Sequence, residues 1–183
     1  CNLRCSYCDT TSAYEGGREM SISSILEEVR GFKTKLVCIT GGEPLINKET
    51  PLLAEALLNE RYTVLVETNG SCDISVLPKA AIKIMDLKCP DSNASPLMHW
   101  QNIAYLTPLD EVKFVLSSRK DYEWAKAIIQ QHCLSEIARV LIGTASGAIP
   151  PKTVVQWLLE DNLNVRFQLQ IHKYIWEPHA KGV

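Results

Sequence analysis

Short apolar runs alternate with amphipathic segments along the whole chain. Apolar runs of about four to eight residues are typical of buried strands, and apolar residues spaced three and four apart predict helices that pack on them. We predict strands at 36–40, 62–67, 81–87, 111–116, 138–143 and 164–171, with helices between most of them. This alternation predicts a parallel sheet with right-handed crossovers.

The predicted helices have recognisable starts and one apolar face each. Ser21 is a favourable N-cap, Thr50 is expected to cap a second helix ahead of Pro51, and Pro151 opens a third. The second helix is expected to bury Leu52, Leu53, Ala56 and Leu57, and the last helix Val154, Val155, Leu158 and Leu159. Apolar residues recur at helical spacing at Ile22, Ile25, Leu26 and Val29, and a helix at about 121–133 carries Trp124, Ile128 and Ile129. A short helix is expected at 100–106 within the irregular segment 91–108.

Six strands are too few to close an eight-stranded (β/α) barrel. We therefore predict the α/β class, with a partial barrel or an open sheet of about six mostly parallel strands. In both architectures the functional groups gather at the carboxyl ends of the strands. A single domain is expected over 1–183, a length that allows a substantial core.

Glycines and polar residues follow several of the predicted strands and should share one rim of the sheet. They are Thr40, Gly41, Gly42 and Glu43 after the first strand, Glu67, Thr68 and Asn69 at the end of the second, Asp86, Leu87 and Lys88 at the end of the third, and 144–146 after a later one. Because glycine lacks a Cβ, Gly41-Gly42 would let a ligand approach the backbone closely. Taken singly, Gly41-Gly42 is more simply explained as a tight turn and Glu67 as a solvated strand end. Their common placement on one rim favours a ligand site.

Composition argues against several functional classes. The chain is 46% hydrophobic and 22% charged with a net charge of −2, which is typical of a globular enzyme. The chain has no excess of basic residues that would indicate nucleic-acid binding. It also has no apolar run that approaches the length of a membrane span.

The first ten residues carry three thiols, Cys1, Cys5 and Cys8, at a C-x3-C-x2-C spacing. Thiolates favour zinc or iron–sulfur clusters, and both normally take four protein ligands. No fourth Cys or His lies within the next 28 residues, so a 4Fe–4S cluster on these thiols would keep one iron open for a small molecule. The spacing alone leaves three alternatives, namely such a cluster, zinc with a remote fourth ligand, or reduced thiols.

The four other cysteines, Cys38, Cys72, Cys89 and Cys133, are scattered. We expect them to be buried thiols of a protein in the reducing cytoplasm. The chain starts on a presumed ligand and without methionine, so an N-terminal segment is expected to be missing.

The cysteine trio is followed, after one predicted helix and one strand, by Gly41-Gly42-Glu43-Pro44. This pair of motifs resembles the radical S-adenosylmethionine superfamily. The resemblance implies that the amino and carboxylate groups of S-adenosylmethionine chelate the open iron, that the GGEP turn contacts its amino group, and that Tyr7 lies near the adenine.

Within that superfamily the chain resembles the 7-carboxy-7-deazaguanine synthase family. The resemblance is carried by Cys8-Asp9-Thr10, Ile39-Thr40-Gly41-Gly42-Glu43-Pro44, Glu67-Thr68-Asn69-Gly70 and Gln168-Leu169-Gln170-Ile171-His172-Lys173-Tyr174. It implies a radical S-adenosylmethionine partial barrel with reduced helices, a homodimer, and an external electron donor such as flavodoxin.

The resemblance also implies a reaction. A radical formed from S-adenosylmethionine would take hydrogen from C6 of 6-carboxy-5,6,7,8-tetrahydropterin and later return it. The pterin would become 7-carboxy-7-deazaguanine with loss of ammonia, on the route to queuosine and related 7-deazapurines. The protein would position the reactants and exclude water and oxygen.

Individual roles follow from the resemblance. The implied cofactor-binding residues are Tyr7, Cys8, Asp9, Gly41, Gly42, Glu43, Glu67, Asp86, Leu87 and Lys88, with Cys1, Cys5 and Cys8 as cluster ligands, Thr10 as a Mg²⁺ ligand and Thr40 as a substrate contact. Of the three residues that end the third strand, only Lys88 matches the family pattern cleanly. For His172 and Lys173 two roles stay open, a contact with the substrate or a cap on the last strand, and the cap is slightly favoured.

The chain also departs from the family, and alternatives remain. Family members carry a strand and a substrate-binding loop before the first cysteine, and both are expected to be missing here. One alternative is an activase that installs a glycyl radical on a partner enzyme, although Asp9-Thr10 is unusual for that class. The other is a zinc-stabilised binding module.

Overall fold

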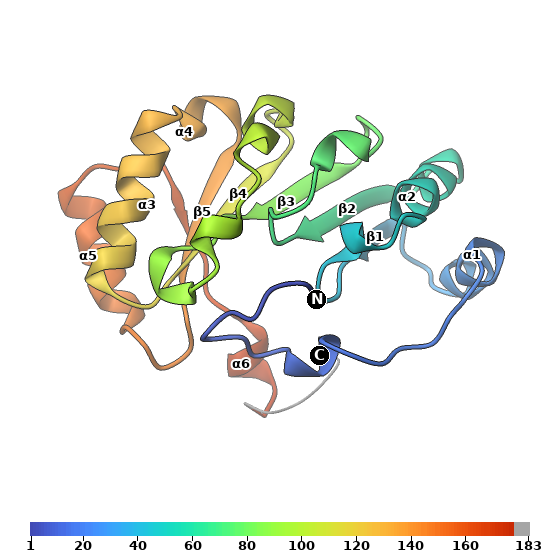
Figure 1. Ribbon diagram of the computed structural model, residues 1–183, viewed down its shortest axis with the longest axis horizontal. Coiled ribbons are helices and arrows are strands. Elements are labelled where there is room, and N and C mark those ends of the chain that lie inside the picture. Colours follow the sequence, from blue (N-terminus) through green and yellow to red (C-terminus); the bar gives the residue numbers. More distant parts are fainter. Residues whose placement is uncertain (178–183) are drawn as a thin grey trace.

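The computed structural model describes residues 1–177, and in that part of the chain six parallel strands form one curved sheet (Figure 1). The strands are β1 Leu36–Ile39, β2 Thr63–Thr68, β3 Ile82–Asp86, β4 Glu111–Leu116, β5 Arg139–Thr144 and β6 Arg166–Phe167. They lie side by side in chain order, so each connection leads to the adjacent strand. Over residues 1–177 the sheet stays open, and the predicted partial barrel is confirmed.

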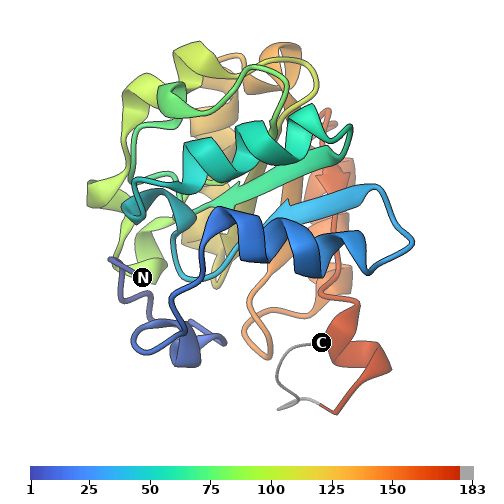
Figure 2. The same cartoon turned by 90° about the vertical axis from the view of Figure 1, so that its right-hand side faces the viewer.

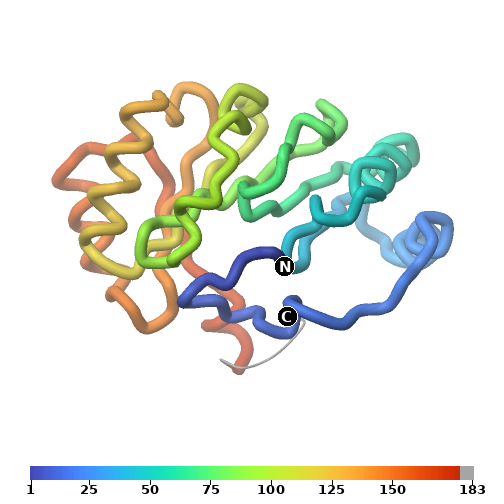
Figure 3. Tube along the Cα trace, viewed as in Figure 1, coloured from blue at the N-terminus to red at the C-terminus, as the bar shows by residue number. Residues whose placement is uncertain are grey.

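Helices α1 Ile22–Arg30, α2 Thr50–Asn59, α3 Arg119–Gln131, α4 Leu134–Ile137 and α5 Pro151–Glu160 cover the outer side of the curved sheet. The last helix, α6 His172–Ile175, lies on the open side near the N-terminal segment. Figure 2 shows α1 and α2 side by side in front of the strands. Figure 3 shows the N-terminal segment, in dark blue, and the red end of the described chain on the same open side of the curved sheet. None of the helices within residues 1–177 combines the length and the apolar character that crossing a membrane requires.

The two faces of the sheet differ because successive residues of a strand point to opposite sides. Val64, Val66 and Phe114 are fully buried and share one core cluster with apolar residues of α2 and α3. On the other face, Glu67 and Lys113 keep part of their surface exposed and lie 3.9 Å apart. The inner face is therefore the one that can carry polar groups toward the rim.

One predicted helix cap and the buried faces of two helices need correction. Ser21 caps α1 as predicted, but Thr50 is not the cap of α2, because its Oγ1 donates to the Pro44 carbonyl at 2.6 Å. Leu52 is 55% exposed and Leu159 is 72% exposed, whereas Ala54 is fully buried. Only a narrow stripe of each helix faces the sheet, and the small Ala54 side chain is the one that fits the closest approach.

The last predicted strand, 164–171, is mostly not a strand. β6 covers Arg166–Phe167, the Gln168 nitrogen still donates to the Ile142 carbonyl at 2.8 Å, and α6 then begins at His172. β6 pairs with β5 alone, so half of its backbone groups have no neighbouring strand to bind. The apolar residues Leu169 and Ile171 are consequently exposed.

The four cysteines outside the N-terminal loop are free thiols, but only Cys89 is buried. Cys72 is half-buried, and the prediction of burial is wrong for Cys38 and Cys133, which are exposed. Cys38 lies on the edge strand β1, and Cys133 lies in a left-handed turn with φ 49° after α3. Both places border solvent, and the apolar neighbours in the sequence do not reveal this.

A buried ion pair joins β3 to the segment before β4. Oδ1 of Asp110 accepts a hydrogen bond from the Lys83 backbone nitrogen at 2.7 Å, and its Oδ2 accepts one from the Thr107 backbone nitrogen at 2.7 Å. Lys83 Nζ lies 3.2 Å from the same Oδ2, and both side chains are almost completely buried. Such a pair is stable only as an intact unit, because each charge has lost its water.

Asp110→Ala should therefore destabilise the protein strongly. It leaves the Lys83 ammonium buried without a counter-charge, which costs about 3–5 kcal/mol of unfolding free energy. Urea unfolding followed by circular dichroism measures the loss, with the exposed Glu55→Ala on α2 as control. A loss below about 1 kcal/mol, typical of a surface substitution, would contradict this account.

Candidate active site

The loop that carries the three cysteines contacts the segments that follow β1, β2 and β3 (Figure 1). Ser6 anchors it after β3, with its nitrogen donating to the Ser92 carbonyl at 3.1 Å and its Oγ donating to the Asp91 carbonyl at 2.6 Å. The Cys8 nitrogen donates to the Cys5 carbonyl at 3.2 Å and closes a turn around Tyr7. The structure thus brings the cysteine loop to the predicted rim.

Gly42 packs directly against Cys1. A Cβ built on Gly42 would lie 2.4 Å from the Cβ of Cys1 and 2.6 Å from its nitrogen, which no real side chain could tolerate. The space on the Cβ side of Gly42 is therefore taken by the first cysteine, and the role of Gly42 in ligand binding stays a prediction. The neighbouring Gly41 has φ +142° and faces open space, so a ligand can approach it from that side.

Glu43 is buried and turned into the protein. Its carboxylate accepts hydrogen bonds from Thr68 Oγ1 at 2.9 Å, from the Asn69 nitrogen at 2.6 Å and from the Leu45 nitrogen at 3.0 Å. Both oxygens are thereby occupied. Glu43 joins the turn after β1 to the end of β2, and its carboxylate does not face the open rim.

Asn69 is a site residue that the sequence interpretation placed on the rim without a role. Its Nδ2 lies 3.6 Å from Cys1 Sγ and donates to Asn2 Oδ1 at 3.0 Å, while its Oδ1 accepts from Ser71 Oγ at 2.6 Å. An amide that donates to a ligand sulfur is typical of the groups that orient and tune metal thiolates.

Three polar side chains lie near the thiols at the end of β3. Lys88 Nζ is 2.5 Å from Asp86 Oδ2, while Asp86 Oδ1 and the Tyr7 hydroxyl are buried without a partner among residues 1–177. Buried polar groups are almost always hydrogen-bonded, so these two atoms fit a polar ligand. Leu87, in contrast, is 1% exposed and belongs to the core, so its side chain is not available to a cofactor.

Burial and the charge of Lys88 have opposite effects on the pKa of Cys5. Burial raises the pKa of the Cys5 thiol, and the nearby Lys88 ammonium acts in the opposite direction. Burial alone would lower the pKa of Lys88, but the attraction of Asp86 raises it above its ordinary value. The lysine therefore stays charged and can stabilise a thiolate when a metal replaces the proton.

Asp9 is bound by the C-terminal segment. Lys173 Nζ lies 2.7 Å from Asp9 Oδ2, Gln170 Nε2 donates to the same oxygen at 3.3 Å, and Thr10 Oγ1 donates to Oδ1 at 3.0 Å. Burial alone would raise the pKa of Asp9, but the hydrogen bonds from Lys173 and Thr10 lower it. Lys173 therefore pairs with the cysteine loop, a contact that neither of the two predicted roles included, and no local pattern could have revealed a partner 164 positions away.

Two predicted site residues do not contact the cysteine loop or the side chains around it. Thr40 is exposed after β1, and Glu67 pairs with Lys113 on the inner face of the sheet.

Within residues 1–177, no three His, Cys, Asp or Glu side chains are arranged to share a single ion. A cubane cluster offers each cysteine its own iron, so its ligands need not converge on one point as zinc ligands do.

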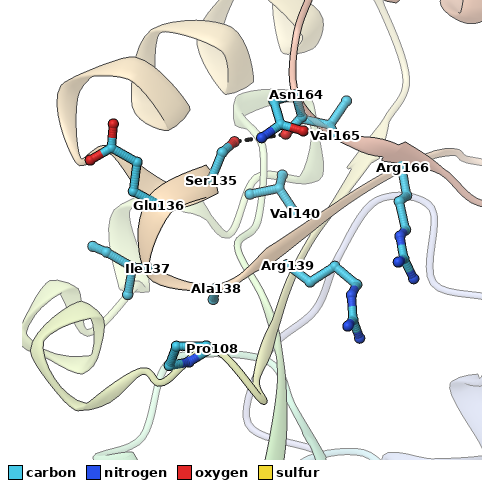
Figure 4. A pocket seen from close by; sticks show the side chains of 10 residues that line it. All are labelled: Pro108, Ser135, Glu136, Ile137, Ala138, Arg139, Val140, Asn164, Val165 and Arg166. Carbon is cyan, nitrogen blue, oxygen red and sulfur yellow. Dashed lines mark hydrogen bonds between the residues drawn. The ribbon is translucent and has the colours of Figure 1, made fainter.

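Two cavities lie at opposite ends of the strands. One of about 340 Å³ lies on the functional side, between the loop after β5 and the C-terminal segment, and Gln170 and Lys173 line it. The other, of about 290 Å³, lies at the amino ends of β5 and β6, where Arg139 and Arg166 border it (Figure 4). The cysteine loop does not line the second cavity, so it is not part of this site.

Comparison with known proteins places these features in a family. The radical SAM superfamily matches residues 1–131. A 7-carboxy-7-deazaguanine synthase of Koribacter versatilis is 40% identical over 198 residues, covering 100% of this chain and 88% of the relative. A 7-carboxy-7-deazaguanine synthase of Chlorobaculum tepidum is 37% identical over 188 residues, covering 100% of this chain and 84% of the relative.

Solved structures show the same fold. The crystal structure of QueE from Escherichia coli matches with a TM-score of 0.73 and 18% identity, over 93% of this chain and 81% of that one. SuiB of Streptococcus suis bound to S-adenosylmethionine matches with a TM-score of 0.62 and 14% identity, over 93% of this chain and 45% of that one. At these identities the likeness concerns the partial barrel alone.

Gly42→Val should prevent assembly of a metal centre on the cysteine loop, because the valine side chain would push Cys1 away from the turn. Iron and sulfide content after anaerobic reconstitution measures the effect. Gly31→Ala at the end of α1 is the control, since its new Cβ meets only the Glu28 carbonyl oxygen at 3.2 Å. A Gly42→Val protein that folds and binds a full complement of iron would contradict the role of this contact.

Proposed function

Because the chain belongs to the radical S-adenosylmethionine superfamily and, within it, to the 7-carboxy-7-deazaguanine synthase family, we propose that it is a carbon–nitrogen lyase. It converts 6-carboxy-5,6,7,8-tetrahydropterin to 7-carboxy-7-deazaguanine with loss of ammonia, in queuosine and 7-deazapurine biosynthesis. The observation that carries the proposal is the 40% identity with a synthase along the whole chain. The relatives named above are synthases, which favours the lyase over an activase or a zinc module.

The residues around the cysteine loop fit the cofactors of this superfamily. Cys1, Cys5 and Cys8 would hold the 4Fe–4S cluster, which together with S-adenosylmethionine supplies the radical that starts the reaction. Gly42 fixes the position of Cys1, and the Asn69 amide donates toward its sulfur. These contacts hold the first ligand before any metal binds.

The chain offers polar groups for S-adenosylmethionine beside the thiols. The open backbone at Gly41 and the unpartnered Tyr7 hydroxyl and Asp86 Oδ1 support binding there. Lys88 is held by Asp86 and would balance negative charge near Cys5. The chain's task is to bind and orient the cofactor and to keep water from the reacting atoms.

Thr10 would hold a Mg²⁺ that also binds the substrate carboxylate. Its Oγ1 donates a hydrogen bond to Asp9 Oδ1 at 3.0 Å, so its lone pairs are available to a cation. Mg²⁺ needs few protein oxygens when the substrate and water supply the others. Thr40, exposed on the same rim, is the proposed substrate contact after β1.

Two partners complete the proposal. An external electron donor such as flavodoxin would reduce the cluster, as the family resemblance implies. A second copy of the chain would form a homodimer, as the family resemblance implies.

The function is tested by product identification. Anaerobically reconstituted protein with the carboxytetrahydropterin, S-adenosylmethionine and a chemical reductant should form 7-carboxy-7-deazaguanine, detected by mass spectrometry. Cys5→Ala removes one iron ligand and should abolish both the cluster and the product. Cys133→Ser changes an exposed thiol outside the loop and should retain both. A different product would overturn the function, and a fully loaded Cys5→Ala protein would overturn the ligand set.

Thr10→Val should raise the apparent KM for the pterin. The change keeps the shape of the side chain but removes the oxygen, and a misplaced substrate costs on the order of 10²-fold in turnover. Adding Mg²⁺ to chelated enzyme should restore turnover in the parent and in Thr10→Ser, which keeps the hydroxyl, far more than in Thr10→Val. Full activity and a full Mg²⁺ response in Thr10→Val would remove Thr10 from the metal site.

A further inference from the structure

One carboxylate connects the C-terminal segment to the cysteine loop. Asp9 uses Oδ2 to accept from Lys173 at 2.7 Å and from Gln170 at 3.3 Å, and it uses Oδ1 to accept from Thr10 at 3.0 Å. Both of its oxygens are thus engaged, each on a different side. The carboxylate is a rigid group, so a change in the hydrogen bond between Lys173 and Asp9 will also change the position of the oxygen that accepts from the Thr10 hydroxyl.

The contact is a partly buried ion pair. The Lys173 side chain is 17% exposed and the Asp9 side chain 44%, and Lys173 and Gln170 also line the cavity of about 340 Å³ on the functional side. The backbone before α6 is fixed as well, because the Gln168 nitrogen donates to the Ile142 carbonyl of β5 at 2.8 Å. The ammonium therefore approaches Asp9 from an anchored segment, and such pairs are worth more than freely mobile ones.

The chemistry of a hydroxyl ligand explains what the contact achieves. A threonine oxygen that binds a cation uses a lone pair and must donate its hydrogen to another acceptor. Asp9 Oδ1 is that acceptor for Thr10. An unpaired carboxylate beside Mg²⁺ would itself be a hard oxygen ligand and would compete with the substrate. Lys173 and Gln170 occupy Oδ2 and keep Asp9 turned toward the threonine.

We propose that Lys173, assisted by Gln170, is a positioning residue that holds Asp9 so that the Thr10 hydroxyl presents its lone pairs to the substrate-binding Mg²⁺. This inference rests on the proposed function, because it requires the cation at Thr10. It gives the C-terminal segment a role in substrate binding that acts through Asp9 and involves no contact between Lys173 and the metal.

A double-mutant cycle tests the inference. Lys173→Met removes the ammonium and keeps much of the side-chain length, and it should raise the apparent KM for the pterin about tenfold while changing kcat less. Combined with Thr10→Val it should add almost nothing, because both changes act through one chain of contacts. Lys173→Arg should restore most of the affinity. Independent, additive effects of the two substitutions would overturn the proposal.

A second readout needs neither turnover nor cofactor. In the metal-free full chain, amide hydrogen exchange in residues 6–13 should be faster in Lys173→Met than in the parent. Lys126→Met is the matched control, because Lys126 of α3 and Asp161, the residue after α5, form a similar pair, with Nζ 2.5 Å from Oδ1 and side chains 26% and 23% exposed. It should leave exchange in 6–13 unchanged.

The two readouts distinguish the possible failures. Faster loop exchange with an unchanged KM in Lys173→Met, while Thr10→Val still raises KM, would make the contact merely structural and overturn the positioning role. If Thr10→Val leaves KM and the Mg²⁺ response intact, the proposed cation site itself is wrong, whatever Lys173→Met does. Unchanged exchange and unchanged KM in Lys173→Met would overturn the contact altogether.

Discussion

The site depends on the close packing of Gly42 against Cys1. Because Gly42 has no Cβ, the turn after β1 and the first cysteine can pack against each other at very short range. A Cβ on Gly42 would lie 2.4 Å from the Cβ of Cys1. The contact fixes the first thiol relative to the edge of the sheet. The missing Cβ of Gly42 is thus needed for packing within the protein itself, and open space lies beside Gly41.

From that contact a hydrogen-bond network extends across the rim. Glu43 binds Thr68 and the Asn69 nitrogen, and Asn69 in turn donates toward the Cys1 sulfur. The carboxylate is buried, and an unsatisfied buried carboxylate is costly, so these partners hold β1 and β2 in register at the site. The acidic residue of the GGEP motif therefore serves the scaffold, and the open polar atoms are those of Tyr7 and Asp86.

The C-terminal segment completes the arrangement from the other end of the chain. β6 ends after two residues, and the segment that follows crosses to the cysteine loop, where Lys173 meets Asp9. The loop is consequently held near its middle by Ser6 and at its end by Asp9. A loop that is fixed at both points is preorganised, so it loses less conformational entropy when it binds a cluster or a substrate.

The sequence by itself determined the alternation of the first five strands with helices, the partial barrel and the polar rim, because apolar periodicity and glycine or proline positions act over a few residues. It did not determine that Ala54 rather than Leu52 meets the sheet, that Cys38 is exposed, or that Glu43 turns inward. Those outcomes, like the pairing of Lys173 with Asp9, depend on partners far apart along the chain, and only the folded backbone brings such partners within bonding distance.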